Sequence, residues 1–502
     1  MAETRWPPTI SDMTNRSFSC FLIGTESLLI SCADVLRDKG HQILGVVSDE
    51  PNIVQWCADH GVRVISGAEP YGTVLAEQPF DYLLSITNLT IVPAEVLALP
   101  RRGAINFHDG PLPRFGGLYA PVWALMAGET EYAITWHRMT AAVDEGDIVL
   151  QRRFAVTEGE TSLTLNSKCF AAGIDSFPEL TDLLASETPP STTHGLDRAT
   201  YHGLSDRPRA LAALDLTRPV AELAALVRAL DFGGYANPVA RPRLVSGDRA
   251  VLVSSVAGAE SIRGTAGEVL SAEDGRLHLA ARDGSLAFAG LATEDGAPLT
   301  GAEALAHLGL RVGERLPALT EQLVAAADAF SAKASRYEGA WASRLATLDP
   351  VELPYADRVS ARAPQIEWLP QPSVIDRDAA IASFLLFVGR LAGRASFDVA
   401  FREAGVVGAP AGLDAFASAC VPLRLTLADQ ATVAEARSTV NTALAWVRRR
   451  AGFARDVTTR RPTLKRLAGR PFVLPVAVEL VAQLPDARGT GADLTLALAA
   501  DG

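Results

Sequence analysis

Three side chains could together move a proton and stabilise an oxyanion: the amide of Asn106, the imidazole of His108 and the carboxylate of Asp144. Residues 102–107 are predicted to form a buried strand that ends at a turn, Asp109 to Pro111. Because alternate residues of a strand face the same side, Asn106 and His108 are expected to share a face at its carboxyl end. Ligands bind at that end of the strands in open α/β sheets. The pattern therefore indicates a site for acyl-type transfer.

The interval from His108 to Asp144 suits one helix, predicted at 118–127, and one strand, predicted at 132–139, before the loop that carries Asp144. Each residue alone has an ordinary explanation, because Asn106 can cap a turn, His108 can be a satisfied strand-end histidine and Asp144 can belong to a plain loop. The whole pattern favours a catalytic site over these explanations.

The motif around these residues resembles that of the formyltransferases that use 10-formyltetrahydrofolate. The family has Asn-x-His, a Leu-Pro turn followed by glycines, and a later Asp-x-Gly-Asp. The corresponding segments here are Asn106-Phe107-His108, Leu112-Pro113 with Gly116-Gly117, and Asp144-Glu145-Gly146-Asp147. Two departures are visible: Asp109 to Pro111 replaces the usual Pro-Ser-Leu, and Gly116 stands where a basic residue is common. The resemblance implies a formyl transferase with 10-formyltetrahydrofolate as its co-substrate.

The resemblance also gives the three residues their roles. When an amine attacks the formyl carbon, an oxyanion forms and an ammonium must lose a proton. Asn106 would donate to the oxyanion, and His108 would donate to it or take the proton. Asp144 would orient His108 and stabilise its charged form.

A folate-binding surface is implied after the predicted buried strand 80–86 and just before Asp144. The implied contact residues are Ile86, Thr87, Asn88, Leu118, Thr140, Ala141, Ala142 and Val143. Several of these could instead be plain core or strand-end residues. His137 is interpreted as a structural histidine of its strand and is left out of the site. Five scattered cysteines without paired spacing argue against a disulfide framework and a zinc site, so no metal is expected.

The amino-terminal half alternates between strand and helix patterns, which predicts a doubly wound, Rossmann-like α/β sheet. The opening elements are a strand at 17–24, a helix at 28–39 and a strand at 41–48. The turn Gly24 to Ser27 lacks the further glycines of a dinucleotide fingerprint, which argues against a nicotinamide cofactor. In methionyl-tRNA formyltransferases a longer basic insertion for the tRNA occupies the place where Asp49 to Pro51 forms a short, acidic connection.

Four regions are predicted along the chain: a tail at 1–17, a catalytic domain at 18–205, a carboxyl-terminal subdomain at 206–316 and a third region at 317–502. The last part of the catalytic domain, 186–205, is rich in Thr, Pro and Gly and is interpreted as a linker. The subdomain is expected to be a small β-barrel, because short strand patterns follow a helix that begins near Thr217. Residues 227–235 resemble the helix and loop that open the carboxyl-terminal subdomain of formyltransferases, and this resemblance implies that the barrel is OB-like. Its strands are predicted at 249–256, 264–270, 276–281 and 285–289.

The third region resembles one lobe of the condensation domains of nonribosomal peptide synthetases. Residues 336–357 are similar to the segment that joins their two lobes, and 421–427 with the helix 432–449 is similar to their second lobe. Those domains condense with a His-His-x-x-x-Asp-Gly motif, and this chain has no histidine after His307. The region is therefore predicted to be an α/β half-condensation lobe that serves as a packing platform.

The Arg-rich stretch 448–470 is interpreted as a solvated helix end, with docking of an acidic carrier protein as the alternative. The alternating strand pattern 494–499 and the following turn predict a boundary, with an adenylation domain beyond it.

Charge and hydropathy limit the partners. The net charge of -12 argues against nucleic acid, which needs clustered Lys and Arg. No apolar run is long enough for a membrane span, and residues 1–16 lack the apolar core of a signal peptide. The cysteine pattern is typical of reducing cytosol, so a cytoplasmic enzyme without membrane contact is expected.

The two resemblances together imply an N-formyltransferase that acts at the start of nonribosomal peptide synthesis. Its expected acceptor is the α-amine of an aminoacyl thioester on a carrier protein, and its partners are that carrier or a downstream adenylation domain. One alternative keeps the chemistry but makes the acceptor a nucleotide-linked amino sugar or a free amine. Another is a non-catalytic synthetase scaffold.

Overall fold

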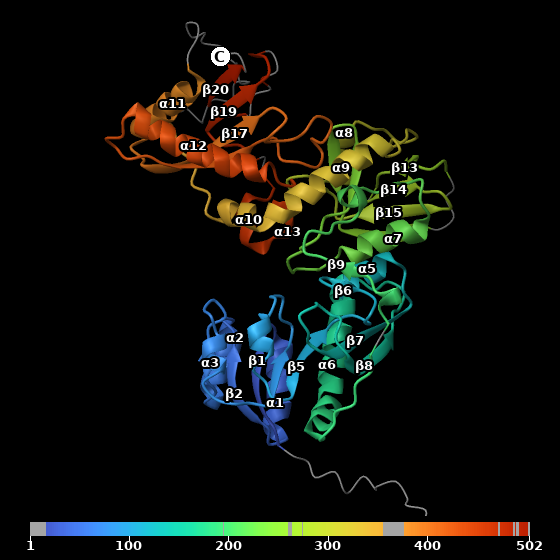
Figure 1. The fold of residues 1–502 in the computed structure, drawn as a ribbon. Helices are drawn as coiled ribbons and strands as arrows, with labels where there is room; N and C mark the ends of the chain where they lie inside the picture. Colours follow the sequence, from blue (N-terminus) through green and yellow to red (C-terminus); the bar gives the residue numbers. More distant parts are fainter. Residues whose placement is uncertain are drawn as a thin grey trace, which may run out of the picture. The chain divides into compact units, whose positions relative to one another are not determined.

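The computed structural model describes residues 17–499 except 194, 260–263, 274, 355–375, 470–471, 485–486 and 488–490. The chain divides into two compact units, residues 1–204 and 205–502, and each is described by itself (Figure 1). Apart from Ser17, the predicted tail lies outside the described residues, as does the end of the predicted joining segment 336–357. No helix in the described part of the chain is both long and apolar enough to cross a membrane.

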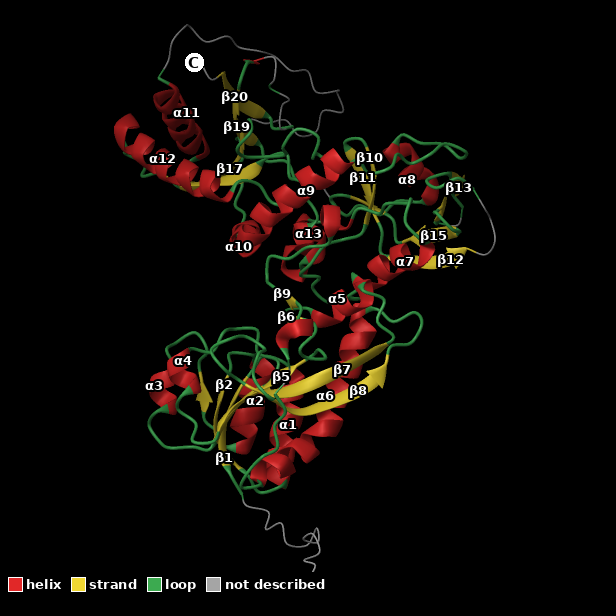
Figure 2. Cartoon of the chain, turned by 45° about the vertical axis from the view of Figure 1, so that its right-hand side comes forward, coloured by secondary structure: helices red, strands yellow, loops and turns green. Residues whose placement is uncertain are grey.

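The first unit is built on a seven-stranded sheet with the order β3-β2-β1-β4-β5-β7-β8. Its strands are β1 Ser19–Ile23, β2 Gln42–Val47, β3 Val64–Ile65, β4 Tyr82–Ser85, β5 Gly103–His108, β7 Glu131–Arg138 and β8 Ile148–Ala155. The pairs from β3 to β5 are parallel, whereas β7 runs antiparallel to β5 and β8 runs antiparallel to β7. The predicted Rossmann-like α/β sheet is therefore present, with an antiparallel hairpin added at one edge (Figure 2).

Helices connect and cover these strands. They are α1 Ser27–Asp38, α2 Pro51–His60, α3 Gly72–Leu75, α4 Ala94–Leu97, α5 Ala120–Met126 and α6 Ser162–Ala185. Helix α6 begins at a capping box formed by Thr161 and Thr164, and it packs against α1, α5, β7 and β8. A Cβ added at Gly173 of α6 would lie 2.9 Å from the Phe107 ring, so this glycine lets α6 approach β5 closely.

The segment after α6 is not a plain linker, contrary to the sequence interpretation. After the short 3₁₀ turn η2 Leu196–Arg198, strand β9 Tyr201–His202 pairs in parallel with β6 Gly116–Gly117. The His202 ring also stacks on Trp123, with 4.3 Å between ring centroids. Composition misled here because a two-residue strand carries no periodic pattern of its own.

The second unit starts with two small antiparallel sheets around a shared apolar core. Their strands are β10 Arg243–Ser246, β11 Arg249–Leu252, β12 Ser255–Ala259, β13 Val269–Ser271, β14 Leu277–Ala280, β15 Ser285–Ala289 and β16 Ala292–Thr293, with η3 Arg209–Ala212, α7 Val220–Ala229 and α8 Gly301–Leu308 alongside. The sheet orders are β10-β11-β16 and β12-β15-β14-β13. An OB-like barrel remains a prediction for this part.

Two predicted strands of this subdomain differ in the structure. The strand predicted at 249–256 is split between the two sheets, because Val253 bonds to Pro242 and Ser254 bonds to Ala289 of the other sheet. The strand predicted at 264–270 begins only at β13, since Gly267 adopts a left-handed φ of 89° within a turn.

The rest of the second unit is a four-stranded sheet with the order β18-β17-β19-β20. Its elements are β17 Ser396–Glu403, β18 Val421–Thr426, β19 Val476–Val481 and β20 Leu494–Ala499, with α9 Glu321–Ala334, η4 Ser335–Tyr337, α10 Glu338–Ala346, α11 Arg377–Ala392, α12 Val433–Arg450, α13 Val457–Arg460 and η5 Pro462–Leu467. Helices α11 and α12 pack together, and an apolar cluster joins both to the sheet.

Candidate active site

The pairing of β5 with β7 sets the geometry of the site. Asn106 and His108 lie at the carboxyl end of β5, and the antiparallel register places His137 of β7 directly opposite Asn106. The Asn106 amide nitrogen, Nδ2, lies 3.2 Å from His137 Nε2. Cross-strand partners share one face of a sheet, so both histidines and the amide gather on the same face.

Asp144 reaches this face from the loop between β7 and β8. Its Oδ2 accepts a hydrogen bond from the Gly117 backbone N–H at 2.7 Å and lies 3.6 Å from His108 Nδ1. Its Oδ1 lies 3.4 Å from His137 Nε2. The carboxylate therefore bridges the two histidines and the β6 backbone.

Backbone constraints explain the glycines of the motif. A Cβ at Gly146 would lie 1.9 Å from the Arg138 carbonyl oxygen, and a Cβ at Gly117 would lie 2.1 Å from the His202 carbonyl oxygen. Asp144 itself takes a φ of 59°, a left-handed conformation that aspartate adopts more readily than most residues. The loop is thus folded tightly enough to aim one carboxylate at both rings.

The environment keeps Asp144 ionised. Burial alone would raise the pKa of its carboxyl group, but the hydrogen bond from His137, the charge of His108 and the Gly117 amide outweigh burial and lower the pKa to about 2. A carboxylate that stays ionised can orient both rings and stabilise positive charge that develops on His108 during the reaction.

His108 is held by a second contact. Its Nε2 lies 2.9 Å from the Phe115 carbonyl oxygen, and the ring is 4% exposed. Because a carbonyl oxygen only accepts, Nε2 carries a proton and Nδ1 is the nitrogen left for proton exchange on the Asp144 side.

The departure at Asp109 to Pro111 has a visible consequence for the site. A Cβ at Gly110 would lie 2.6 Å from His108 Nε2, so the glycine makes room for this ring position. The neighbouring Asp109 carboxyl is buried, which raises its pKa.

His137, which the sequence interpretation leaves out of the site, lies beside the three predicted residues in the structure. Its Nδ1 lies 3.0 Å from the Arg138 carbonyl oxygen, so Nδ1 carries a proton and Nε2 faces both Asn106 and Asp144. The uncharged ring can accept from the Asn106 amide, whereas the charged ring donates to Asp144. The available signal was the register of the β5–β7 pair, which puts residues 106 and 137 opposite each other.

The predicted folate-contact residues fall into three places. Ile86 follows β4 with its side chain fully buried, so its backbone is the part available to a ligand. Thr87 has a φ of 53°, and the Asn88 side chain bonds within its own turn to Thr90. Leu118 is half-buried after β6, and the segment 140–143 is exposed before Asp144. These assignments stay predictions.

Comparison with known proteins decides the family. The formyl transferase family matches residues 68–181. The methionyl-tRNA formyltransferase of Burkholderia pseudomallei (strain 1106a) is 33% identical over 279 residues, which make up 54% of this chain and 80% of that protein. The chain belongs to the formyltransferase family. It is therefore a one-carbon transferase that moves a formyl group to an amine, with 10-formyltetrahydrofolate as its co-substrate.

Two solved structures are also similar to this chain. An N-formyltransferase from Helicobacter canadensis in complex with folinic acid and dTDP-3-aminofucose is 14% identical with a TM-score of 0.46, over 54% of this chain and 98% of that chain. HypX from Aquifex aeolicus in complex with tetrahydrofolic acid is 18% identical with a TM-score of 0.39, over 60% of this chain and 50% of that chain. No cluster of three or more metal-ligating side chains occurs in the described ranges of this chain.

Proposed function

We propose that this formyltransferase acts on the α-amine of an aminoacyl thioester carried by a carrier protein, at the start of nonribosomal peptide synthesis. The observation that carries the formyl transfer is the convergence of Asn106, His108, His137 and an ionised Asp144 on one face of the sheet. The acceptor is inferred from the region beyond 317, with its resemblance to a condensation lobe, and from the acidic character of the chain.

The reaction divides among these side chains. The acceptor amine forms a bond to the formyl carbon, and a second N–H of the Asn106 amide donates to the developing oxyanion. His108 takes the proton from the new ammonium at Nδ1, while Asp144 stabilises the resulting imidazolium. The bond to the donor nitrogen then breaks, and His108 returns the proton to that nitrogen. His137 holds the Asn106 amide in position for oxyanion stabilisation and the Asp144 carboxylate in position for proton transfer.

The chain has a surface suited to the folate donor. The segment after β4 carries the strained Thr87 backbone, and Leu89 and Ile91 expose 68% and 81% of their area. Val143, before Asp144, is also exposed at 42%. Apolar side chains without protein cover beside a polar site are typical of surfaces that bind a flat organic group. The donor supplies an activated formyl carbon when it is bound.

A tRNA acceptor is disfavoured by the structure of the connection between β2 and α2. Only residues 48–50 join Val47 to Pro51, and Asp49 is fixed by a hydrogen bond from the Gly67 N–H at 3.0 Å. The connection is short and acidic and the net charge of the chain is -12, which supports an acceptor other than a nucleic acid.

The acceptor profile tests the proposal. Purified protein is assayed with 10-formyltetrahydrofolate and four acceptors: an aminoacyl carrier protein, a nucleotide-linked amino sugar, a free amino acid and methionyl-tRNA. We expect the carrier-bound amine to give the highest kcat/KM. Preference for the amino sugar or the free amine would overturn the acceptor but retain the chemistry, and turnover of none of the four would mean that the acceptor is an amine of another class.

A matched pair of histidine variants links turnover to the site. His108→Ala should lower formylation by about 100-fold to 10,000-fold, whereas His60→Ala, which removes an exposed histidine at the end of α2, should leave it unchanged.

A further inference from the structure

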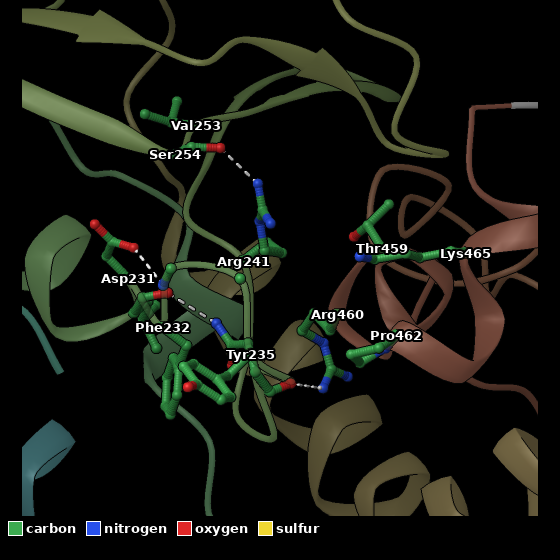
Figure 3. A pocket seen from close by; sticks show the side chains of 14 residues that line it. Asp231, Phe232, Tyr235, Arg241, Val253, Ser254, Thr459, Arg460, Pro462 and Lys465 are labelled. Atoms are coloured by element: carbon green, nitrogen blue, oxygen red, sulfur yellow. Dashed lines mark hydrogen bonds between the residues drawn. The ribbon is translucent and has the colours of Figure 1, made fainter. Parts of the chain in front are cut away.

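A cavity of about 260 Å³ lies inside the second unit, between the loop after α7 and the segment that runs from α13 into η5 (Figure 3). Its lining residues that bear on ligand binding are Asp231, Phe232, Tyr235, Arg241, Ser254 and Lys465. None of them belongs to the formyl-transfer site, which lies wholly in the first unit.

Two cations of this cavity, Arg241 and Lys465, form no ion pair within 4 Å among the described residues. Arg241 is half-buried, and burial lowers its pKa. Its guanidinium donates to Ser254 Oγ at 2.6 Å, and no carboxylate of the described residues lies within 4 Å of it. Lys465 likewise has no described carboxylate within that distance, and Figure 3 shows its amino group directed toward the Arg241 side. Asp456 and Asp231 act on Arg241 from longer range, and Asp456 already accepts the Arg241 backbone N–H and a hydrogen bond from Arg243. The guanidinium of Arg241 therefore has N–H groups that can donate to an anion.

The wall of the cavity adds further positive charge. Behind it lies a linked group in which four guanidiniums share two carboxylates. The group consists of Arg207, Arg243, Arg460 and Arg461 with Glu338 and Asp456. Asp231, the one carboxylate among the lining residues, accepts the Gly233 N–H at 2.8 Å and attracts Arg241 from beyond ion-pair distance. In a chain of net charge -12, this group stands out as locally electropositive.

Two aromatic rings line the same cavity at a distance from the cations. Phe232 lines the cavity, and Tyr235 is 75% exposed, without a stacking partner among the described aromatic contacts. A cavity that has cations in one part and an exposed ring in another suits a ligand that carries both an anion and a flat group.

We propose that this cavity binds a small phosphorylated molecule, with its phosphoryl group between Arg241 and Lys465 and its flat group on Tyr235. Arginine and lysine are the usual phosphate partners, and Arg241 can present two N–H groups to one oxyanion. The volume is just below the range of about 300–1,000 Å³ for whole-ligand pockets, which fits a phosphoryl group seated inside and a ring at the exposed edge. The site is separate from the proposed acceptor chemistry.

Binding of inorganic phosphate and AMP to the full chain tests the proposal. Isothermal titration calorimetry should show that both ligands bind saturably and that AMP binds more tightly than phosphate. Lys465→Gln and Arg241→Lys should each weaken both ligands about tenfold, as expected for loss of a charged hydrogen bond. Tyr235→Ala should weaken AMP and leave phosphate unchanged.

Lys333→Gln, on the exposed part of α9, makes the same charge change away from the cavity and should bind like wild type. Since Lys465 is exposed, its variant keeps the test valid even if a change at Arg241 disturbs folding. Absence of saturable phosphate and AMP binding by the wild type, or equal binding by wild type and Lys465→Gln, would overturn the proposal. Formylation is measured separately on the same proteins. Phosphate binding does not depend on the folate-dependent reaction, so failure of the cavity proposal can be distinguished from failure of the proposed function.

Discussion

Replacing Asp144 by Asn removes one negative charge from the centre of the site and changes little else. The side chain is 9% exposed, and asparagine can still accept the Gly117 N–H through its own oxygen. What disappears is the charge that faces His108 at 3.6 Å and His137 at 3.4 Å. The variant therefore isolates electrostatic stabilisation of the imidazolium from the shape of the loop.

The size of the effect follows from that geometry. Two unit charges about 4 Å apart attract by on the order of 4 kcal/mol at an effective dielectric constant of about 20. If the His108 charge develops fully in the transition state, this loss corresponds to roughly a 1,000-fold lower rate. General acid-base help is itself worth about 100-fold to 10,000-fold, so the two arguments agree.

The assay is single-turnover formylation with saturating donor, so that product release does not mask the chemical step. Asp175→Asn, an exposed carboxylate on α6, makes the same chemical change outside the site and should retain full activity. A folded Asp144→Asn protein with turnover within a few fold of wild type would refute the assigned role of the carboxylate.

Three further outcomes are expected. Gly117→Ala should lower formylation and stability, because its Cβ would clash with the His202 carbonyl oxygen. Gly128→Ala is the control: it is also at positive φ but has open space around it, so it should cost only about 1 kcal/mol of unfolding free energy and keep activity. Equal activities of the two variants would contradict this. His137→Phe should reduce kcat more than the KM for donor, and rescue by Gln would separate positioning from packing. The folded pKa of Asp144, about 2, lies below its ordinary value near 3.8, so its stabilising contribution of roughly 2 kcal/mol is present above pH 4 and lost as the pH falls toward 2. The free energies of urea unfolding of wild type and Asp144→Asn should therefore differ less at pH 3 than at pH 5.

Contacts between the third region, 317–502, and the preceding subdomain determine where the chain can be truncated. The sequence boundary near residue 316 would suggest truncation there, but Arg243 is fully buried against Asp456 at 2.7 Å, and such a cut would leave that guanidinium unpaired. An apolar cluster also joins Val245 to Phe416. The division at Leu204 avoids these contacts, so a fragment ending there is the one to assay with a small amine surrogate.

The sequence predicts much of the active site because its signals are local. Alternation along β5 places Asn106 and His108 on one face, and the turn residues after them end the strand. The Asp-x-Gly-Asp segment predicts a tight loop, which the Gly146 contact with Arg138 requires. Strand and helix periodicity likewise predicts most elements of the first sheet.

The remainder depends on pairings between distant residues that no local pattern records. His137 joins the site only because β5 and β7 pair antiparallel in one register. The Phe115 carbonyl reaches His108 through an irregular turn, and Asp456 meets Arg243 across more than 200 residues. Residue type alone made His137 resemble an ordinary core histidine, and a neighbouring strand was needed to reveal its role.

The most direct test of the central claim is formylation of an aminoacyl carrier protein from 10-formyltetrahydrofolate, followed by mass spectrometry of the carrier-bound amino acid. The wild-type chain should give the N-formyl product, and His108→Ala, folded and still able to bind folate, should lower the rate by about 100-fold to 10,000-fold. Formylation by the His108→Ala protein at the wild-type rate would contradict the account.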